Sequence, residues 1–242
     1  MSDREVLLAR LRAAVADAFR DHTDVADPLA RLCRACVQLL PVDGASVSLM
    51  TGAEHRETLY ASDPVVGHIE TLQFSLGEGP CFEAFTTGRP VLIADLAADA
   101  ASAWPVFATQ MAGQPVGAIF AFPLLLGAAR VGAIDMYRRT PGWLTPTELA
   151  TALRIADIAA SALIAPHRGG LDTGLGEVWL AVLPRNSEQV HQVTGMLIAE
   201  YAIPAHEALA RLRGYAFANG RLINEVAADL VTRRTHPREI SP

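Results

Sequence analysis

Three arginine residues lie close together in the segment RLRGYAFANGRLINEVA, residues 211–227: Arg211, Arg213 and Arg221. A guanidinium group can bind a phosphate or the edge of a base through two parallel hydrogen bonds, so this arrangement is typical of nucleic-acid contact. Solvated surface arginines are the alternative, because runs of charge usually lie on an exposed face. The chain as a whole has a net charge of −6, which excludes a general basic field that would draw it to nucleic acid or anionic lipid.

The charge is unevenly distributed along the chain. Residues 185–234 hold six arginines and five acidic residues, so this segment has a net charge of +1 and the rest of the chain has −7. All twenty basic residues are arginine, a bias that the codon usage of a GC-rich bacterial genome explains without a functional cause.

Polar side chains accompany these arginines. Gln192 and Thr194 lie off the apolar stripe of a preceding helical pattern, and Asn219 lies in the break before Arg221. Amide and hydroxyl groups at such positions can bind base edges or a ribose 2′-hydroxyl. Arg221 stands at the start of a helical pattern, where the helix N-terminus and the guanidinium can together hold a phosphate.

A second group with potential chemistry is Glu78 and Cys81, in the glycine-rich stretch GEGPC. Both could contact a small ligand, although a capped helix start and a buried thiol explain them equally well. Cys33 and Cys36 have the spacing of a redox or zinc pair, but they lie inside a helical pattern and have no second pair, which favours a structural role. We therefore expect no catalytic residue, no metal site and no cofactor.

The composition describes a folded protein of the reducing cytosol. Of the 242 residues, 51% are hydrophobic, which is ample for real cores. The N-terminus lacks an apolar segment of signal-peptide length, and three cysteines fit a cytoplasmic location. The longest apolar run is interrupted by Pro123, Gly127 and Arg130, which predicts two adjoining strands and no membrane span.

The first two thirds of the chain mix helical and strand patterns. Helices are predicted over 3–20, 25–40, 64–74, from Pro80 to about 87, and over 145–165, and strands over 45–50, 57–62, 91–96, 116–126 and 129–139. The order predicts an α+β domain of about 140–150 residues with an antiparallel sheet.

This part of the chain resembles a GAF domain over residues 22–165. The resemblance rests on LGEGPCFEAFTTGRPVLIADL, FPLLLGAARVGAIDMYR and LTPTELATALRIADIAASAL. It implies a six-stranded antiparallel sheet flanked by helices and a role in sensing a small molecule or a partner protein. Glu78 and Cys81 are the candidate ligand-binding residues.

The last part of the chain reads as purely helical. After a glycine-rich linker at 166–185, residues 186–234 show three apolar stripes with the period of short helices, which must pack together to be stable. This segment resembles the ANTAR domain through HQVTGMLIAE, EALARLRGYAFANGR and NEVAADLV, and residues 235–242 form a tail. It departs from the family pattern in the bulky Val193, in the absence of a lysine near Thr194, and in Pro204 at the start of the second helix.

The ANTAR resemblance implies a regulator of transcription antitermination that binds paired hairpins in nascent RNA. The expected RNA-binding residues are Gln192, Thr194, Arg211, Arg213, Asn219 and Arg221, and the missing lysine is expected to weaken phosphate contact. Apolar stripes at residues 1–21 and 147–163 suggest a homodimer, which would present two RNA-binding modules at once.

Three other interpretations stay open at this stage. The helical bundle could serve assembly alone, as a protein-interaction scaffold. The GEGPC loop is similar to one cysteine-bearing loop of the free methionine sulfoxide reductases, although the other cysteines of that family have no match here. The break at 219–221 also has the appearance of a DNA-binding helix-turn-helix.

Overall fold

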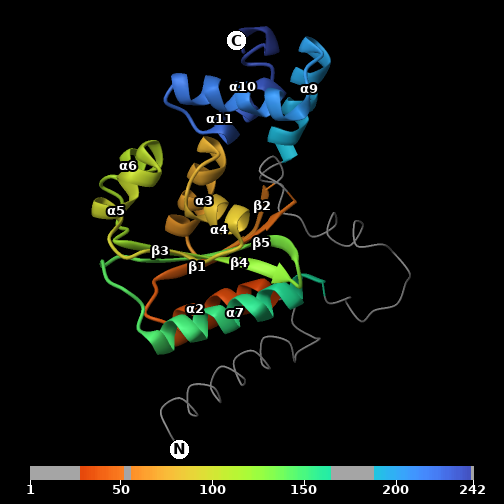
Figure 1. The fold of residues 1–242 in the computed structure, drawn as a ribbon. Helices are drawn as coiled ribbons and strands as arrows, with labels where there is room; N and C mark the ends of the chain where they lie inside the picture. Colours follow the sequence, from red (N-terminus) through yellow and green to blue (C-terminus); the bar gives the residue numbers. More distant parts are fainter. Residues whose placement is uncertain (1–27, 52–55, 165–187, 241–242) are drawn as a thin grey trace, which may run out of the picture.

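A five-stranded antiparallel sheet forms the centre of the first domain, with the strand order β2-β1-β5-β4-β3. The computed structural model describes residues 28–51, 56–164 and 188–240 (Figure 1). Its strands are β1 (Gly44–Met50), β2 (Arg56–Ala61), β3 (Val91–Ile93), β4 (Ala118–Leu126) and β5 (Ala129–Arg138). The helices of this domain are α2 (Pro28–Leu39), α3 (Pro64–Leu76), α4 (Pro80–Thr87), α5 (Leu96–Ala103), α6 (Pro105–Met111) and α7 (Pro146–Ile164).

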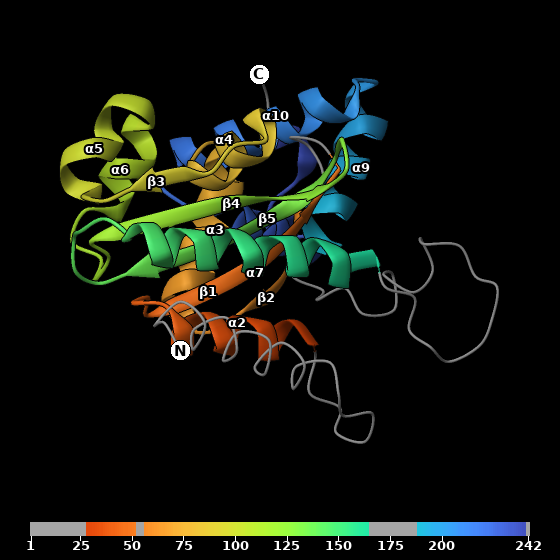
Figure 2. The same ribbon diagram turned by 60° about the horizontal axis from the view of Figure 1, so that its bottom comes forward.

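The helices cover the two faces of the sheet unequally. Helices α2 and α7 lie side by side on one face, and α3 to α6 lie on the other (Figures 1 and 2). The alternation of side chains along β1 fits this division, since Ala45 and Val47 belong to the core under α2 and α7. The intervening Ser46 and Ser48 are also buried, but on the opposite face.

Local sequence signals account for the helix ends. The Asp63 side chain accepts hydrogen bonds from the amides of Val65 and Val66 at the start of α3, and Gly77 ends that helix with a φ of 69°. At α7, the Thr145 hydroxyl accepts from the Glu148 amide and the Glu148 carboxylate accepts from the Thr145 amide. This reciprocal capping confirms the helix start predicted there.

The sheet has fewer strands than the GAF resemblance implied. The strand expected over 91–96 ends at Ile93, because Asp95 caps α5 through the amides of Ala97 and Ala98. The chain between β3 and β4 then forms two short helices. Among the described residues, five strands therefore stand in place of the six expected.

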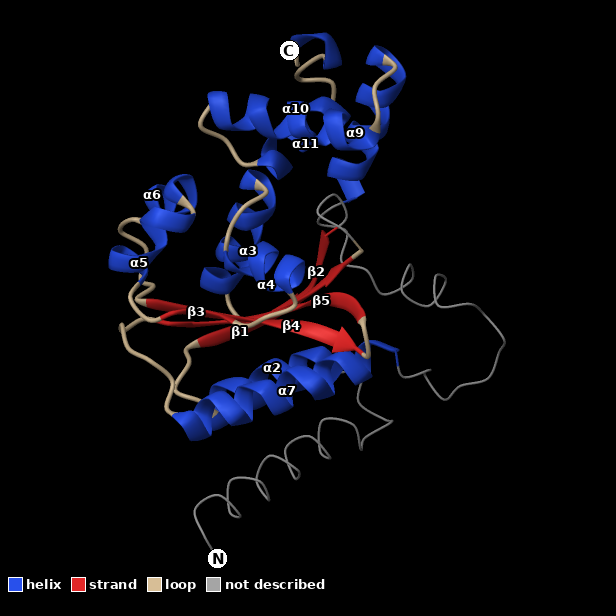
Figure 3. Cartoon of the chain, in the orientation of Figure 1, coloured by secondary structure: helices blue, strands red, loops and turns tan. Residues whose placement is uncertain are grey.

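The C-terminal part is a small bundle without strands in its described residues, in contrast to the mixed first domain (Figure 3). It contains α9 (Glu188–Tyr201), α10 (Ala205–Ala218), α11 (Ile223–Val231) and the 3₁₀ turn η1 (Pro237–Glu239). The three predicted helices are confirmed, and Gly220 has the left-handed φ of 61° expected between α10 and α11.

The bundle core includes residues from outside the three helices. Ile240 from the predicted tail is buried in it, and the Tyr201 hydroxyl donates to the Pro237 carbonyl at 3.1 Å. Phe74 of α3 also belongs to this core. The tail and one helix of the first domain thus complete the apolar interior of the bundle.

Two of the predictions made from the sequence concern residues that the structure does not describe. The helix expected within residues 1–21 and the linker at 166–185 lie outside the described residues. Within the described residues, no helix is long and apolar enough to cross a membrane.

Candidate functional site

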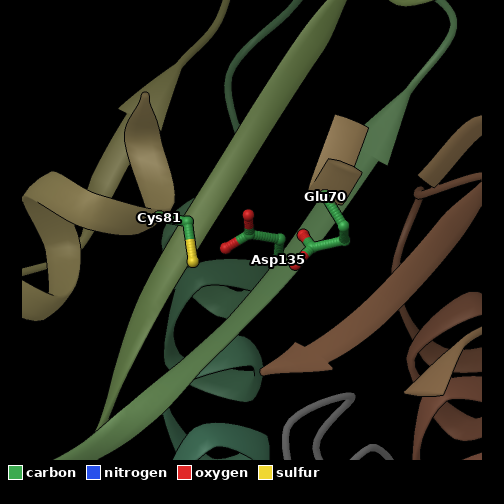
Figure 4. A group of neighbouring side chains, drawn as sticks. All are labelled: Glu70, Cys81 and Asp135. Atoms are coloured by element: carbon green, nitrogen blue, oxygen red, sulfur yellow. The ribbon is translucent and has the colours of Figure 1, made fainter. Parts of the chain in front are cut away.

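A group of polar side chains is buried between the sheet and helices α3 and α4. We call Arg56, Glu70, Gln73, Cys81 and Asp135 the buried polar cluster. They come from β2, α3, α4 and β5, and each is at most 2% exposed. Figure 4 shows three of them converging. Burying this many polar groups is costly unless each finds a partner, so the group is unlike an ordinary core.

The Glu70 carboxylate is the best satisfied member. It forms an ion pair with Arg56 and accepts hydrogen bonds from the hydroxyls of Ser46 at 2.9 Å and Ser48 at 2.6 Å. Arg56 also donates to the Glu70 main-chain carbonyl at 2.8 Å. These contacts hold the Glu70 carboxylate at a fixed position on α3.

Asp135 is only partly satisfied. Its Oδ2 accepts from the Gln73 side chain at 2.8 Å, while Oδ1 is buried with no hydrogen-bond donor. Burial raises the pKa of Asp135 well above its ordinary value, the nearby charge of Glu70 raises it further, and Arg56 opposes the shift. In Figure 4 the Asp135 carboxylate lies between Cys81 and Glu70.

Cys81 is fixed by its main chain and surrounded by protein. Its amide donates to the Gln73 side-chain oxygen at 2.8 Å, and its sulfur lies 4.0 Å from the sulfur of Met50. Burial raises the pKa of the Cys81 thiol well above its ordinary value, although Arg56 lowers it. The thiol is therefore neutral at physiological pH and is a poor nucleophile in this environment.

Arg56 keeps its positive charge in this setting. Burial by itself lowers the pKa of its guanidinium, but the neighbouring groups that can become negative, with Cys81 first and then Glu70 and Asp135, outweigh burial and raise the pKa above its ordinary value. The guanidinium also lies over the Phe82 ring, 5.4 Å from its centre. The cluster thus combines one permanent cation with three groups that can carry negative charge.

The sequence model of the GAF domain family matches residues 22–164, more than half of the chain. The chain belongs to the GAF domain family. GAF domains are sensing modules for small molecules or proteins, and the predicted GAF resemblance is confirmed. No curated protein matches the chain.

Solved GAF domains share the fold at low sequence identity. The GAF domain of an Acinetobacter phosphoenolpyruvate-protein phosphotransferase is 15% identical, with a TM-score of 0.53, over 71% of this chain and 100% of its own. The corresponding domain from Coxiella burnetii is 15% identical, with a TM-score of 0.52, over 66% and 94%. A free methionine-R-sulfoxide reductase from Neisseria meningitidis, in complex with its substrate, is 14% identical over 66% and 90%, but its TM-score of 0.47 is too low to inform function.

The structure separates the two ligand-binding residues predicted in the GAF domain. Cys81 belongs to the buried polar cluster, whereas the Glu78 carboxylate accepts from the Phe107 amide at 2.9 Å, near the start of α6. The other four members of the cluster were not predicted from the sequence. A charged residue inside an apolar strand, Asp135 in VGAIDMYR, was the available signal, because such a charge needs a buried partner.

The two other cysteines occupy ordinary core positions. The side chains of Cys33 and Cys36 are buried on α2, packed under the sheet on the face away from the cluster. Burial raises the pKa of the Cys36 thiol to about 12. Their structural role, predicted from the helical pattern, is confirmed.

The predicted RNA-binding residues have different surroundings in the bundle. Gln192 and Asn219 are exposed. Thr194 is half-buried, and its hydroxyl donates to the Val190 carbonyl at 2.7 Å. The Arg211 guanidinium pairs with Glu207 at 2.7 Å and lies over the Tyr201 ring at 5.1 Å.

The remaining two arginines make longer-range contacts. Arg221 pairs with Asp229 of α11 at 2.8 Å, and its side chain is 35% exposed. Arg213 lies against the GAF domain, where its Nε donates to the Phe74 carbonyl at 3.0 Å. Its guanidinium lies 5.5 Å from the centre of the Phe74 ring and 6.0 Å from that of Phe82. Arg213 is therefore half-buried against the GAF domain, whereas a run of charge favours a solvated side chain.

A second polar contact joins the two parts of the chain. The Ile223 amide, at the start of α11, donates to the Ser75 hydroxyl of α3 at 3.2 Å. The first amides of a helix have no partner within it, so a residue of the GAF domain caps α11. We call the contacts of Phe74 and Ser75 with Arg213 and Ile223 the docking contact.

Proposed function

We propose that this protein is an RNA-binding regulator of transcription antitermination. In this proposal the GAF domain senses a small molecule or a partner protein, and the C-terminal bundle is an ANTAR domain that binds paired hairpins in nascent RNA. The resemblance of residues 186–234 to that family supports the proposal, and so does the compact three-helix core.

The observation that carries the proposal is the exposed turn between α10 and α11. The Phe217 side chain is 55% exposed at the end of α10, and the exposed Asn219 and Gly220 follow it. An aromatic side chain facing solvent offers a stacking surface for an unpaired base, and an adjacent amide can bind a base edge. Hairpin loops present such unpaired bases.

The docking contact supplies a means of control. Helix α3 holds Glu70 and Gln73 in the buried polar cluster and, in the next turn, Phe74 and Ser75 in the docking contact. An event at the cluster that shifts α3 would change how the bundle is held. Arg213 would then be released from the Phe74 carbonyl and could bind a phosphate.

We also propose that the protein acts as a homodimer, since two modules on one assembly raise the effective concentration at paired hairpins. The stripe of α7 is largely used inside its own domain, where Ile155 and Ala159 are buried. Leu153 on α7 and Val37 on the adjacent α2 are 40% and 38% exposed. Light scattering tests this: a monomer at micromolar concentration would contradict paired binding.

The central experiment measures binding of the full chain to three nucleic acids across a salt series: a two-hairpin RNA, a single hairpin and a duplex DNA of matched charge. We expect the two-hairpin RNA to bind most tightly. Replacing Phe217 by Ala should weaken that binding roughly 5- to 100-fold, the effect of losing one stacked base.

A matched control is Ile198→Ala on α9, which removes a side chain that is 37% exposed away from the turn. Equal weak binding to all three nucleic acids, or equal effects of the two substitutions, would overturn the RNA proposal. An absence of nucleic-acid binding would instead favour the scaffold interpretation. Turnover of free methionine sulfoxide would favour the enzyme interpretation, for which the buried neutral Cys81 thiol offers no support.

A further inference from the structure

Glu70, Cys81 and Asp135 each direct one potential ligand atom toward the same point. Their carboxylate oxygens and thiol sulfur all lie within 4.8 Å of one another, and all three residues are buried (Figure 4). They come from α3, α4 and β5, so the fold brings together residues that are distant in sequence. Among the described residues, this is the one such group found.

An unsatisfied atom within the group points to a missing partner. Asp135 is only 2% exposed, and its Oδ1 atom, which is buried, accepts no hydrogen bond. A buried carboxylate oxygen of this kind is rare, because it loses its water without gaining a donor. The Glu70 carboxylate lies beside it. The repulsion between the negative charges of Glu70 and Asp135 is relieved only when a proton or a cation binds between them.

The charges of the surrounding residues match a divalent cation. Arg56 supplies one positive charge and is already paired with Glu70. If the Cys81 thiol and the Asp135 carboxyl release their protons to solvent, three negative charges face Arg56 and a doubly charged ion, and the cluster becomes neutral. Charges that are buried away from water are stable only when they balance one another.

We propose that Glu70, Cys81 and Asp135 bind a divalent first-row transition-metal ion of the zinc type. A thiolate with two carboxylates is a borderline-soft ligand set, which suits Zn²⁺ and its neighbours better than Mg²⁺ or Ca²⁺, since these prefer oxygen alone. Gln73 would orient two of the ligands, because its amide nitrogen donates to Asp135 and its oxygen accepts from the Cys81 amide.

The metal site goes beyond the proposed RNA function and does not depend on it. Its ligands lie wholly within the GAF domain, and metal binding has its own readout. The metal site and the RNA function can therefore fail separately.

The test uses the full chain after treatment with a chelator. Titration with Zn²⁺ against a chromophoric competitor should give one ion per chain, and Co²⁺ should produce the ultraviolet charge-transfer band of a cobalt–thiolate bond. Cys81→Ala should abolish that band and weaken Zn²⁺ binding at least about 100-fold, the upper end of what loss of an outer-shell partner costs. Asp135→Asn should weaken Zn²⁺ binding comparably.

The matched control is Cys36→Ala, which removes a buried thiol on the opposite face of the sheet and should leave the cobalt band intact. Circular dichroism establishes that each variant is folded, and the two cluster variants are independent of each other. The proposal is overturned if the folded wild-type chain binds neither ion. It is also overturned if the cobalt band survives in Cys81→Ala or disappears equally in Cys36→Ala.

Discussion

At the scale of single residues, the Arg56–Glu70 pair determines whether the buried polar cluster can exist. Both side chains are almost fully buried, and an ion pair in such a place gains stability only when further hydrogen bonds satisfy the remaining lone pairs and protons. Two serine hydroxyls and a main-chain carbonyl provide such bonds, while Nε of Arg56 is buried without a hydrogen-bond acceptor. Each partner is therefore much more important to the other than a surface ion would be.

Removing one partner of the Arg56–Glu70 pair should lower the stability of the protein. We expect Glu70→Ala to lower the free energy of unfolding by about 3–5 kcal/mol, because Arg56 would be left buried and uncompensated. Urea denaturation in the presence of a chelator measures this. The control is Asp229→Ala, which breaks the pairs with Arg221 and Arg234 in the bundle and should cost less, since Arg234 is 69% exposed. Equal losses would contradict the special role of the buried pair.

The Cys36 thiol predicts a dependence of stability on alkaline pH. Its pKa rises from 9.0 to about 12 in the folded state, so the unfolded chain loses this proton first and the stabilisation is lost as pH rises above about 9. At pH 10 this thiol should account for about 1 kcal/mol of lost stability. Cys36→Ala should reduce the difference in unfolding free energy between pH 8 and pH 10 by that amount, and an unchanged difference would contradict the assignment.

At the scale of elements, helix α3 serves two sides of the molecule. Its side chains at Glu70 and Gln73 face the sheet, and those at Phe74 and Ser75 reach the bundle. Gly77 ends the helix in the left-handed conformation, beside Arg213. A Cβ atom at this position would lie 2.9 Å from Nη1 of Arg213.

Replacing Gly77 should therefore have two effects. Gly77→Ala should lower stability by about 1–2 kcal/mol through its positive φ, and it should also displace Arg213 and loosen the docking contact. Gly113→Ala is the matched control, since Gly113 has a φ of 83° and open space around it. Amide exchange at Ile223, which donates to Ser75, should accelerate in the first variant alone. Equal exchange in both would contradict the link.

The elements themselves were largely predictable from the sequence, because their signals are local. A long apolar run interrupted by Pro123, Gly127 and Arg130 marked β4 and β5, and the helical pattern that begins at Thr145 marked α7. The shortness of β3 was missed, since the competing cap at Asp95 determines where it ends. The cluster was missed for a different reason: Arg56 and Asp135 lie on separate strands and Glu70 lies on α3, so they meet only through the packing of α3 on the sheet, which no local pattern encodes.

At the scale of the whole molecule, the GAF domain contributes a residue to the apolar core of the bundle. Phe74 of the GAF domain is buried among residues of α9, α10 and α11. Arg213 closes this contact with a hydrogen bond and two ring contacts. Both parts could be predicted separately from the sequence, but the contact of Arg213 with Phe74 could not, because it joins residues that are distant along the chain.

Arg213→Ala should loosen the docking contact while leaving both parts folded. The loss of a hydrogen bond from a charged donor should cost about 1.5–3 kcal/mol of docking free energy. Faster amide exchange at Ile223 and easier proteolytic cleavage between residues 164 and 188 would be the readouts. Arg154→Ala, an exposed position on α7, is the control. If exchange at Ile223 does not change, Arg213 does not hold the bundle in place.

The position of α3 restricts how such a protein can be recombined with others. A chimera joined between residues 164 and 188 would keep the chain continuous, yet it would pair a foreign α3 with this bundle. The new helix would need an aromatic residue, a hydroxyl and a glycine where Phe74, Ser75 and Gly77 stand. Exchanging sensors between relatives should therefore succeed only when α3 is transplanted together with the bundle whose helix α11 it caps.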